Sequence, residues 1–116
     1  MNLYHALFDL KDDAKAVAFA HALEHWLGHL REAGTIGGWR LFRRKLGLAS
    51  AAHRDFLLEI DVADMAALDR VFRHVARHDD EIERLYAPVH SMVARVEVGL
   101  YRPFPDPERA ERVSLL

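Results

Sequence analysis

Residues 55–62 read Asp-Phe-Leu-Leu-Glu-Ile-Asp-Val, and their alternation decides the fold. In an extended chain Phe56, Leu58, Ile60 and Val62 point to one side, and Glu59 and Asp61 point to the other. A period of two that includes aromatic and β-branched residues is typical of a half-buried strand. This stretch therefore predicts a strand whose sheet has one apolar face.

Three other stretches, residues 3–10, 36–45 and 93–101, also have strand character. Between them the apolar period changes to that of amphipathic helices. The first helix is expected over residues 14–33, with Asp12 or Asp13 at its N-terminus and Gly34 after its end. Gly28, inside this helix, suggests a point of close packing. A second helix is expected after Asp64, with its pattern restarting at Asp79-Asp80.

The element order is β-α-β-β-α-β, which predicts an α+β, ferredoxin-like sandwich. Right-handed crossovers place the helices on one face of a four-stranded antiparallel sheet. We expect residues 1–103 to form this domain and residues 104–116 to form a C-terminal tail.

Sorting the strands by face separates an apolar set from a mixed set. The apolar set, expected beneath the helices, is Tyr4, Ala6, Phe8, Leu10, Phe56, Leu58, Ile60, Val62, Val96, Val98 and Leu100. The opposite face combines leucines with charges of both signs. It could simply be solvated, as antiparallel sheets allow. The favoured interpretation is that it stacks on the same face of a second copy, giving a homodimer.

Composition limits the function classes. The chain has 116 residues, 51% hydrophobic and 29% charged, which fits one globular domain. A formal net charge of -2 gives no field for nucleic acid or an anionic membrane, so neither is an expected partner. The chain has no cysteine, signal-peptide pattern or bilayer-length apolar run, so a soluble cytoplasmic protein is expected.

The chain resembles the dimeric α+β barrel superfamily over residues 2–103. The resemblance rests on residues 5–11 (HALFDLK) before a long helix, residues 56–68 (FLLEIDVADMAAL) and residues 96–101 (VEVGLY). Within the superfamily the chain is most similar to stress-responsive barrel proteins and small bacterial families of unknown function.

The superfamily includes cofactor-free monooxygenases acting on aromatic polyketides and quinol-like substrates. It also includes haem-binding proteins, lactone isomerases and proteins without known catalysis. The resemblance implies a ligand in the barrel lumen or in the cleft between sheet and helices. It also matches His5 to a first-strand histidine that stress-responsive members often carry.

The mixed face holds the candidate site, and no cofactor is expected there. His5 and Glu59 are the candidate catalytic pair, because a histidine beside a carboxylate can act as a general base. The candidate ligand-binding residues are Trp26, Trp39, Arg95, Glu97 and Tyr101. A charged side chain inside an interface must also be paired, so the polar residues could instead only hold two subunits in register. For the two tryptophans, a place in the core is the favoured interpretation and a place in a pocket wall is the alternative.

Histidines recur every four residues on the first helix at His21, His25 and His29, and again at His74 and His78. Imidazoles at this spacing can chelate zinc, nickel or copper. Without a carboxylate ligand at a fixed place, a solvated helix face is the favoured interpretation, and no resident metal is predicted.

Three functions remain open from the sequence. The first is a stress-associated homodimer that binds a small apolar or aromatic metabolite. The second is a cofactor-free monooxygenase or isomerase with His5 as general base. The third is a structural or interaction module without a ligand.

Overall fold

The computed structural model describes residues 1–45, 47–48, 50, 52–77 and 79–105. Its elements, in chain order, are β1 (Asn2–Leu10), a short 3-10 helix η1 (Asp13–Lys15), α1 (Ala16–Glu32), β2 (Trp39–Arg43), β3 (Phe56–Val62), α2 (Met65–Val75), α3 (Asp80–Met92) and β4 (Val93–Tyr101). The order matches the expected one, and the second helical region consists of two helices. The expected tail falls largely outside the described residues.

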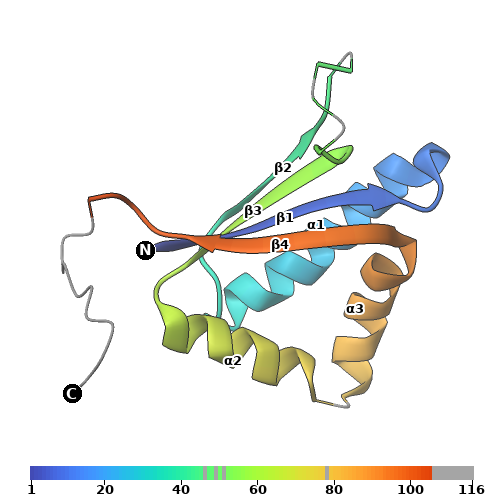
Figure 1. Ribbon diagram of the computed structural model, residues 1–116. Helices are drawn as coiled ribbons and strands as arrows, with labels where there is room; N and C mark the ends of the chain where they lie inside the picture. The colour runs from blue at the N-terminus through green and yellow to red at the C-terminus, as the bar shows by residue number, and fades with distance from the viewer. Residues whose placement is uncertain (46, 49, 51, 78, 106–116) are drawn as a thin grey trace.

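The four strands form one antiparallel sheet in the order β2-β3-β1-β4. All three α-helices lie on the same side of this sheet (Figure 1). The predicted ferredoxin-like α+β architecture is therefore confirmed. The central strands are β1 and β3, and they pair with each other in a register that puts His5 opposite Glu59.

Aspartates begin the helices, because a carboxylate can accept from backbone N–H groups that have no partner within the helix. The Asp12 carboxylate accepts from the Ala14 N–H at 3.0 Å. The carboxylates of Asp64 and Asp79 each accept one N–H, at 2.8 Å, in the first turns of α2 and α3. After α1, Gly34 has φ +76°, a left-handed conformation that glycine adopts without a steric penalty. The first helix differs from the expectation at its start, because Asp12 caps η1 and α1 begins at Ala16 after Lys15, which makes no side-chain capping bond. The caps of α2 and α3 and the end of α1 before Gly34 agree with the sequence.

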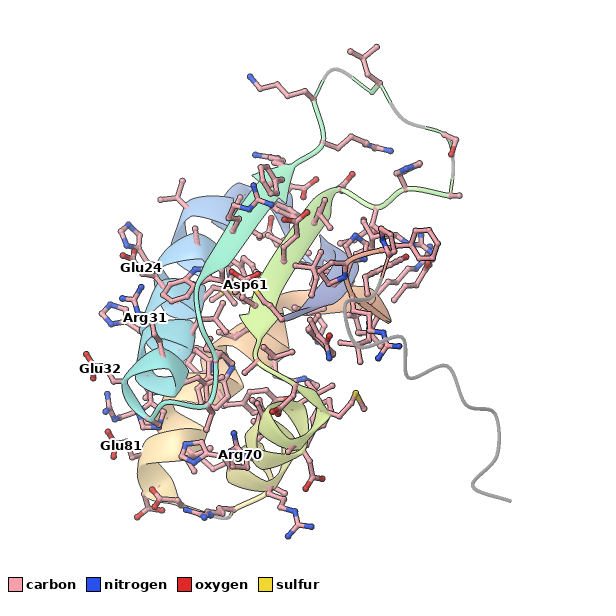
Figure 2. All side chains as sticks on the ribbon, turned by 90° about the vertical axis from the view of Figure 1, so that its left-hand side faces the viewer. Glu24, Arg31, Glu32, Asp61, Arg70 and Glu81 are labelled. Atoms are coloured by element: carbon pink, nitrogen blue, oxygen red, sulfur yellow. The ribbon has the colours of Figure 1, made fainter. Side chains whose placement is uncertain are left out.

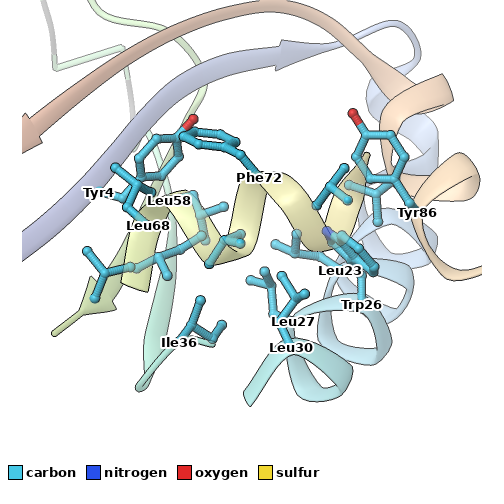
Figure 3. A pocket seen from close by; sticks show the side chains of 15 residues that line it. Tyr4, Leu23, Trp26, Leu27, Leu30, Ile36, Leu58, Leu68, Phe72 and Tyr86 are labelled. Atoms are coloured by element: carbon cyan, nitrogen blue, oxygen red, sulfur yellow. The ribbon is translucent and has the colours of Figure 1, made fainter. Parts of the chain in front are cut away.

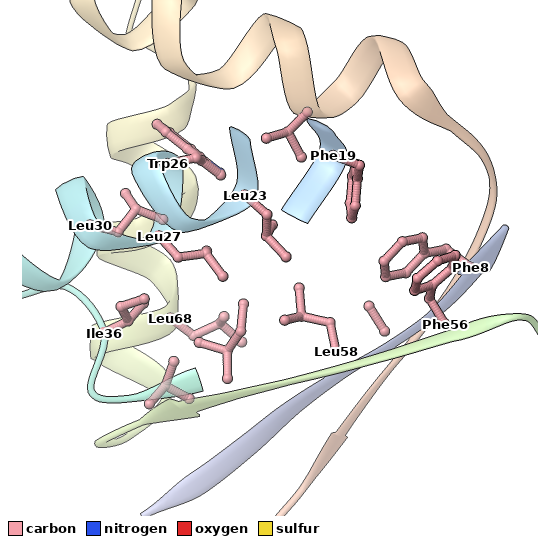
Figure 4. Packing of buried hydrophobic residues seen from close by; sticks show 14 of the residues in the cluster. Phe8, Phe19, Leu23, Trp26, Leu27, Leu30, Ile36, Phe56, Leu58 and Leu68 are labelled. Atoms are coloured by element: carbon pink, nitrogen blue, oxygen red, sulfur yellow. The ribbon is translucent and has the colours of Figure 1, made fainter. Parts of the chain in front are cut away.

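The core lies between α1 and the two central strands (Figure 4). Phe8 and Phe56, paired across β1 and β3, stack with ring centroids 5.4 Å apart. Phe19 of α1 packs at 5.4 Å from Phe8 and is almost fully buried. Leucines of α1 continue this layer toward the other end of the helix. The helix stripe and the strand alternation thus meet as the sequence predicts.

The edge strand β4 departs from the prediction. Its apolar residues share the helix-facing side with β1, since Val96 pairs with Phe8 and Val98 with Ala6. However, Val96 and Val98 are 57% and 61% exposed, and Leu100 is 39% exposed. The expectation that Val96, Val98 and Leu100 lie beneath the helices is therefore wrong. Alternation determines the side to which they point, but the helices centre on β1 and β3 and leave the outer strand uncovered (Figure 1).

No helix within the described part of the chain has both the length and the apolar character needed to cross a membrane.

Candidate functional site

A cavity of about 260 Å³ lies between the helix-facing side of the sheet and the helices (Figure 3). Side chains of α1, α2, α3, β1 and β3 line it, and most are aliphatic. Tyr4, Trp26 and Tyr86 are the lining residues with a polar group, and none of the described lining residues is charged. The cavity therefore offers an apolar surface with a few hydrogen-bonding groups.

The two tyrosines lie on opposite sides of this cavity (Figure 3). Tyr4 packs edge-on against Phe72, with ring centroids 6.3 Å apart, and Phe72 is 54% exposed. Burial, and next the nearby Tyr86, raise the pKa of Tyr4 above its ordinary value. Tyr4 thus keeps its hydroxyl proton at neutral pH and can donate a hydrogen bond.

Trp26 belongs to both the core and the cavity wall. Its side chain is 5% exposed, and its ring packs against Tyr86 at 5.3 Å. Tyr86 in turn has its hydroxyl 3.3 Å from Nδ1 of His90. The sequence offered core and pocket as alternatives for Trp26, and this placement combines them.

The opposite, mixed face of the sheet carries His5 at its centre. The Tyr101 ring packs edge-on against the His5 ring at 5.4 Å. Glu59 is directly across from His5 but forms an ion pair with Arg40. No described residue makes a hydrogen bond to the His5 ring. The neighbouring carboxylate thus already has a cationic partner.

The remaining charges of this face form a second network. Glu97 accepts two hydrogen bonds from Arg54, from Nε at 3.0 Å and from Nη2 at 2.7 Å. Arg54 also lies 3.7 Å from Asp9, whose other carboxylate oxygen accepts the Asp55 N–H at 2.9 Å. Arg95 is opposite Asp9 in the β1–β4 register. Sequence reasoning missed Arg54, because it precedes β3 and has no periodic position.

The candidate residues from the sequence are divided between the two sides of the sheet. Trp39 pairs with the buried Ile60 and has the Arg31 guanidinium 4.8 Å from its ring centre, so it lies on the helix side with Trp26. His5 and Tyr101 lie on the other side with Glu59, Arg95 and Glu97. A single cleft cannot contain both groups, because the sheet separates them.

The histidine row of α1 also divides. His21 and His25 are exposed on the surface of α1. His29 is half-buried, and its Nε2 lies 3.0 Å from Nε2 of His74. His78 lies outside the described residues. Among the described residues, no three His, Asp or Glu side chains are grouped to hold a metal ion.

The His74 environment disfavours a positive charge. Burial is the largest cause of a lowered pKa for His74, followed by the proximity of His29 and Arg77. Asp79 and Glu81 act in the opposite direction but do not outweigh these effects. His74 is therefore held neutral to a lower pH than an exposed histidine.

Comparison with solved structures places the chain among ferredoxin-like proteins. A dimeric ferredoxin-like protein of unknown function from a Jannaschia species is 13% identical, with a TM-score of 0.63, covering 89% of this chain and 100% of the other. A DABB family protein with a ferredoxin-like fold from Mesorhizobium loti is 17% identical, with a TM-score of 0.64, covering 88% and 95%. SnoaB, a cofactor-independent oxygenase from Streptomyces nogalater, is 10% identical, with a TM-score of 0.62, covering 90% and 97%. At these identities the similarity shows the fold alone.

No curated protein matches the sequence. A family profile does, and it spans residues 1–116. The chain therefore belongs to the family of unknown function DUF6614.

Proposed function

We propose that this protein is a homodimer that binds a small apolar or aromatic metabolite in the cavity between the helices and the sheet. The observation that carries the proposal is the 260 Å³ cavity, whose mostly aliphatic walls also include Tyr4, Trp26 and Tyr86. Ligand sites are typically concave and apolar with a few well-placed polar groups, and most measure roughly 300–1,000 Å³. At about 260 Å³ this cavity lies just below that range, so its size favours a small ligand.

The charge of the lining favours a neutral ligand. A buried carboxylate or ammonium needs a paired charge, because transfer out of water is costly. The polar residues of the described cavity walls are Tyr4, Tyr86 and Trp26 instead, and the Tyr86 hydroxyl already lies 3.3 Å from Nδ1 of His90. These groups suit carbonyl or hydroxyl oxygens on an otherwise apolar molecule.

The homodimer proposal rests on the mixed face. Leu3, Leu7 and Leu57 are half-buried there and Phe42 is 43% exposed, so a second copy would remove apolar surface from water. The neighbouring charges already form ion pairs within the chain, which lowers the cost of covering them. The related Jannaschia protein is described as dimeric, which supports the same assembly here. The association with stress rests on the family resemblance alone.

A cavity-filling substitution tests ligand binding. Val71→Trp places an indole in the cavity wall, and we expect the affinity for the neutral fluorescent probe N-phenyl-1-naphthylamine to fall by tenfold or more. Val17→Trp makes the same change on the 73% exposed surface of α1 and should leave probe binding intact. Equal binding by both variants, or no binding by the wild type, would leave the interaction-module function as the better candidate.

An enzyme with His5 as general base is the second candidate. The observation that favours it is the His5 imidazole, which has no hydrogen bond to a described residue and lies against the Tyr101 ring. Such a histidine can accept a proton from a phenol or an activated carbon, and a tyrosine hydroxyl can stabilise the resulting oxyanion. The similarity in fold to the cofactor-independent oxygenase SnoaB adds plausibility to a monooxygenase or isomerase. Its substrate would occupy the mixed face and not the cavity.

A further inference from the structure

The contact between His29 and His74 joins two helices that line the cavity. His29 is in the last turn of α1, and His74 is in the last turn of α2. Their Nε2 atoms are 3.0 Å apart, so one ring donates a proton and the other accepts it. Leu30 and Val75, the residues that follow them, both line the cavity.

Few residues of helix α2 are buried. Only Ala67 and Leu68 are buried among its residues, and Met65 and Phe72 are 60% and 54% exposed. Segments with little buried apolar surface open at a lower free energy than the rest of a domain. Val71 and Val75 pack partly buried against the core, and the histidine contact adds a hydrogen bond between the ends of α1 and α2.

We propose that the His29–His74 contact is an acid-sensitive latch that holds α2 over the cavity and releases it when both imidazoles are protonated. The proposal concerns regulation of the cavity and rests on the proposed function for its biological role. The latch itself is a property of the two side chains and can be measured without any ligand.

The first proton leaves the latch closed. Nδ1 of His29 is 4.0 Å from the Glu81 carboxylate of α3, which projects beside the end of α1 (Figure 2). A doubly protonated His29 can therefore face Glu81 with Nδ1 and still donate from Nε2 to a neutral His74. The other charged groups that act on His74 are Arg77, which opposes its protonation, and Asp79, which favours it together with Glu81.

The second proton opens the latch. When His74 also becomes cationic, both Nε2 atoms carry a proton, the hydrogen bond is lost and two positive charges face each other. Burial and the neighbouring His29 lower the pKa of His74, so this step falls below the ordinary histidine value of about 6.5. The closed state is fully present above that pH and is lost progressively as the pH falls through the lowered pKa of His74.

The ring stacking of His29 connects the latch to the cavity wall. The His29 ring is nearly parallel to that of Trp26, at a centroid distance of 6.1 Å, and Trp26 lines the cavity. Displacement of His29 therefore disturbs the wall as well as the end of α2. Acid should both destabilise α2 and speed the exit of a bound molecule.

The test follows the dissociation rate of N-phenyl-1-naphthylamine from the full chain between pH 7.5 and 5.0. We expect this rate to rise about fivefold in the wild type, which corresponds to the loss of one ordinary hydrogen bond. His74→Gln keeps a hydrogen-bonding group that does not titrate, so its rate should change by less than twofold. His25→Gln removes an exposed histidine from the same helix and should retain the wild-type acid response.

Thermal unfolding without the probe separates the latch from the proposed function. The wild-type unfolding temperature should fall more than that of His74→Gln between pH 7.5 and 5.0. If the probe does not bind, the proposed function fails and these curves still decide the latch. Parallel curves for wild type and His74→Gln, or loss of the acid response in His25→Gln, would overturn it. Should His74→Gln not fold, His29→Gln removes the same pair and serves in its place.

Discussion

At the scale of single residues, position relative to the sheet decides which chemistry a side chain can perform. His5 lies on the mixed face among ion pairs, whereas Trp26 and Tyr4 border an uncharged cavity. Glu59, the expected partner of His5, is held by Arg40. A catalytic His5 would therefore act beside the Tyr101 ring, and the Glu59 carboxylate opposite it would already be paired with Arg40.

The enzyme candidate predicts a clear loss on substitution of His5. If the wild type turns over any member of a panel of quinols and polycyclic phenols, His5→Ala should lower the rate by about 10²–10⁴-fold, the usual contribution of a general base. Oxygen uptake and product formation are the measurements. His25→Ala, an exposed histidine on α1, should keep the full rate. An unchanged rate in His5→Ala would remove the enzyme candidate.

At the scale of elements, helix α1 contains a glycine that no close contact requires. The sequence suggested close packing at Gly28, but a Cβ placed there meets no atom within 4 Å. Glycine inside a helix costs about 1 kcal/mol relative to alanine. Gly28 therefore weakens α1 without making a close contact that a methyl group would disturb.

Two glycine substitutions in and after α1 should have opposite effects. Gly28→Ala should raise the free energy of unfolding by about 1 kcal/mol, a shift of roughly 4 °C in unfolding temperature. Gly34→Ala should lower it by about 1 kcal/mol, because φ +76° strains any residue with a Cβ. Thermal and denaturant unfolding measure both. Destabilisation by Gly28→Ala would show that a neighbour does occupy this site.

At the scale of the whole molecule, the sheet has one face under helices, and no helix of the described residues covers the other (Figure 1). The uncovered face combines half-buried leucines with ion pairs. The proposed dimer predicts a mass in solution of about twice 13.3 kDa. Glu59→Arg places a second cation beside Arg40 at the centre of this face and should shift the protein toward 13.3 kDa.

Glu24→Arg is the matched control for the dimer, because Glu24 is an exposed carboxylate on α1, which lies on the helix side of the sheet and not on the mixed face (Figure 1). Sedimentation or light scattering at micromolar concentration gives the mass of each variant. A wild type that sediments as a monomer, or an intact dimer in Glu59→Arg, would contradict the assignment of this face as the interface.

The sequence by itself determined the order of the elements, the caps of α2 and α3 and the side to which each strand residue points. These features are local: alternation in residues 55–62 and 93–101 follows from the strand period, and capping by Asp64 or Asp79 involves the next three residues. Strand β4 was predicted with its observed bounds for the same reason.

Only the tertiary structure decided which of those sides is covered and which side chains meet. The helices leave Val96 and Val98 exposed, although their pattern equals that of a buried strand. The contact between His29 and His74 joins residues 45 apart, and Arg54 reaches Glu97 across 43 residues. No periodicity encodes such pairs, because they depend on how whole elements pack against one another.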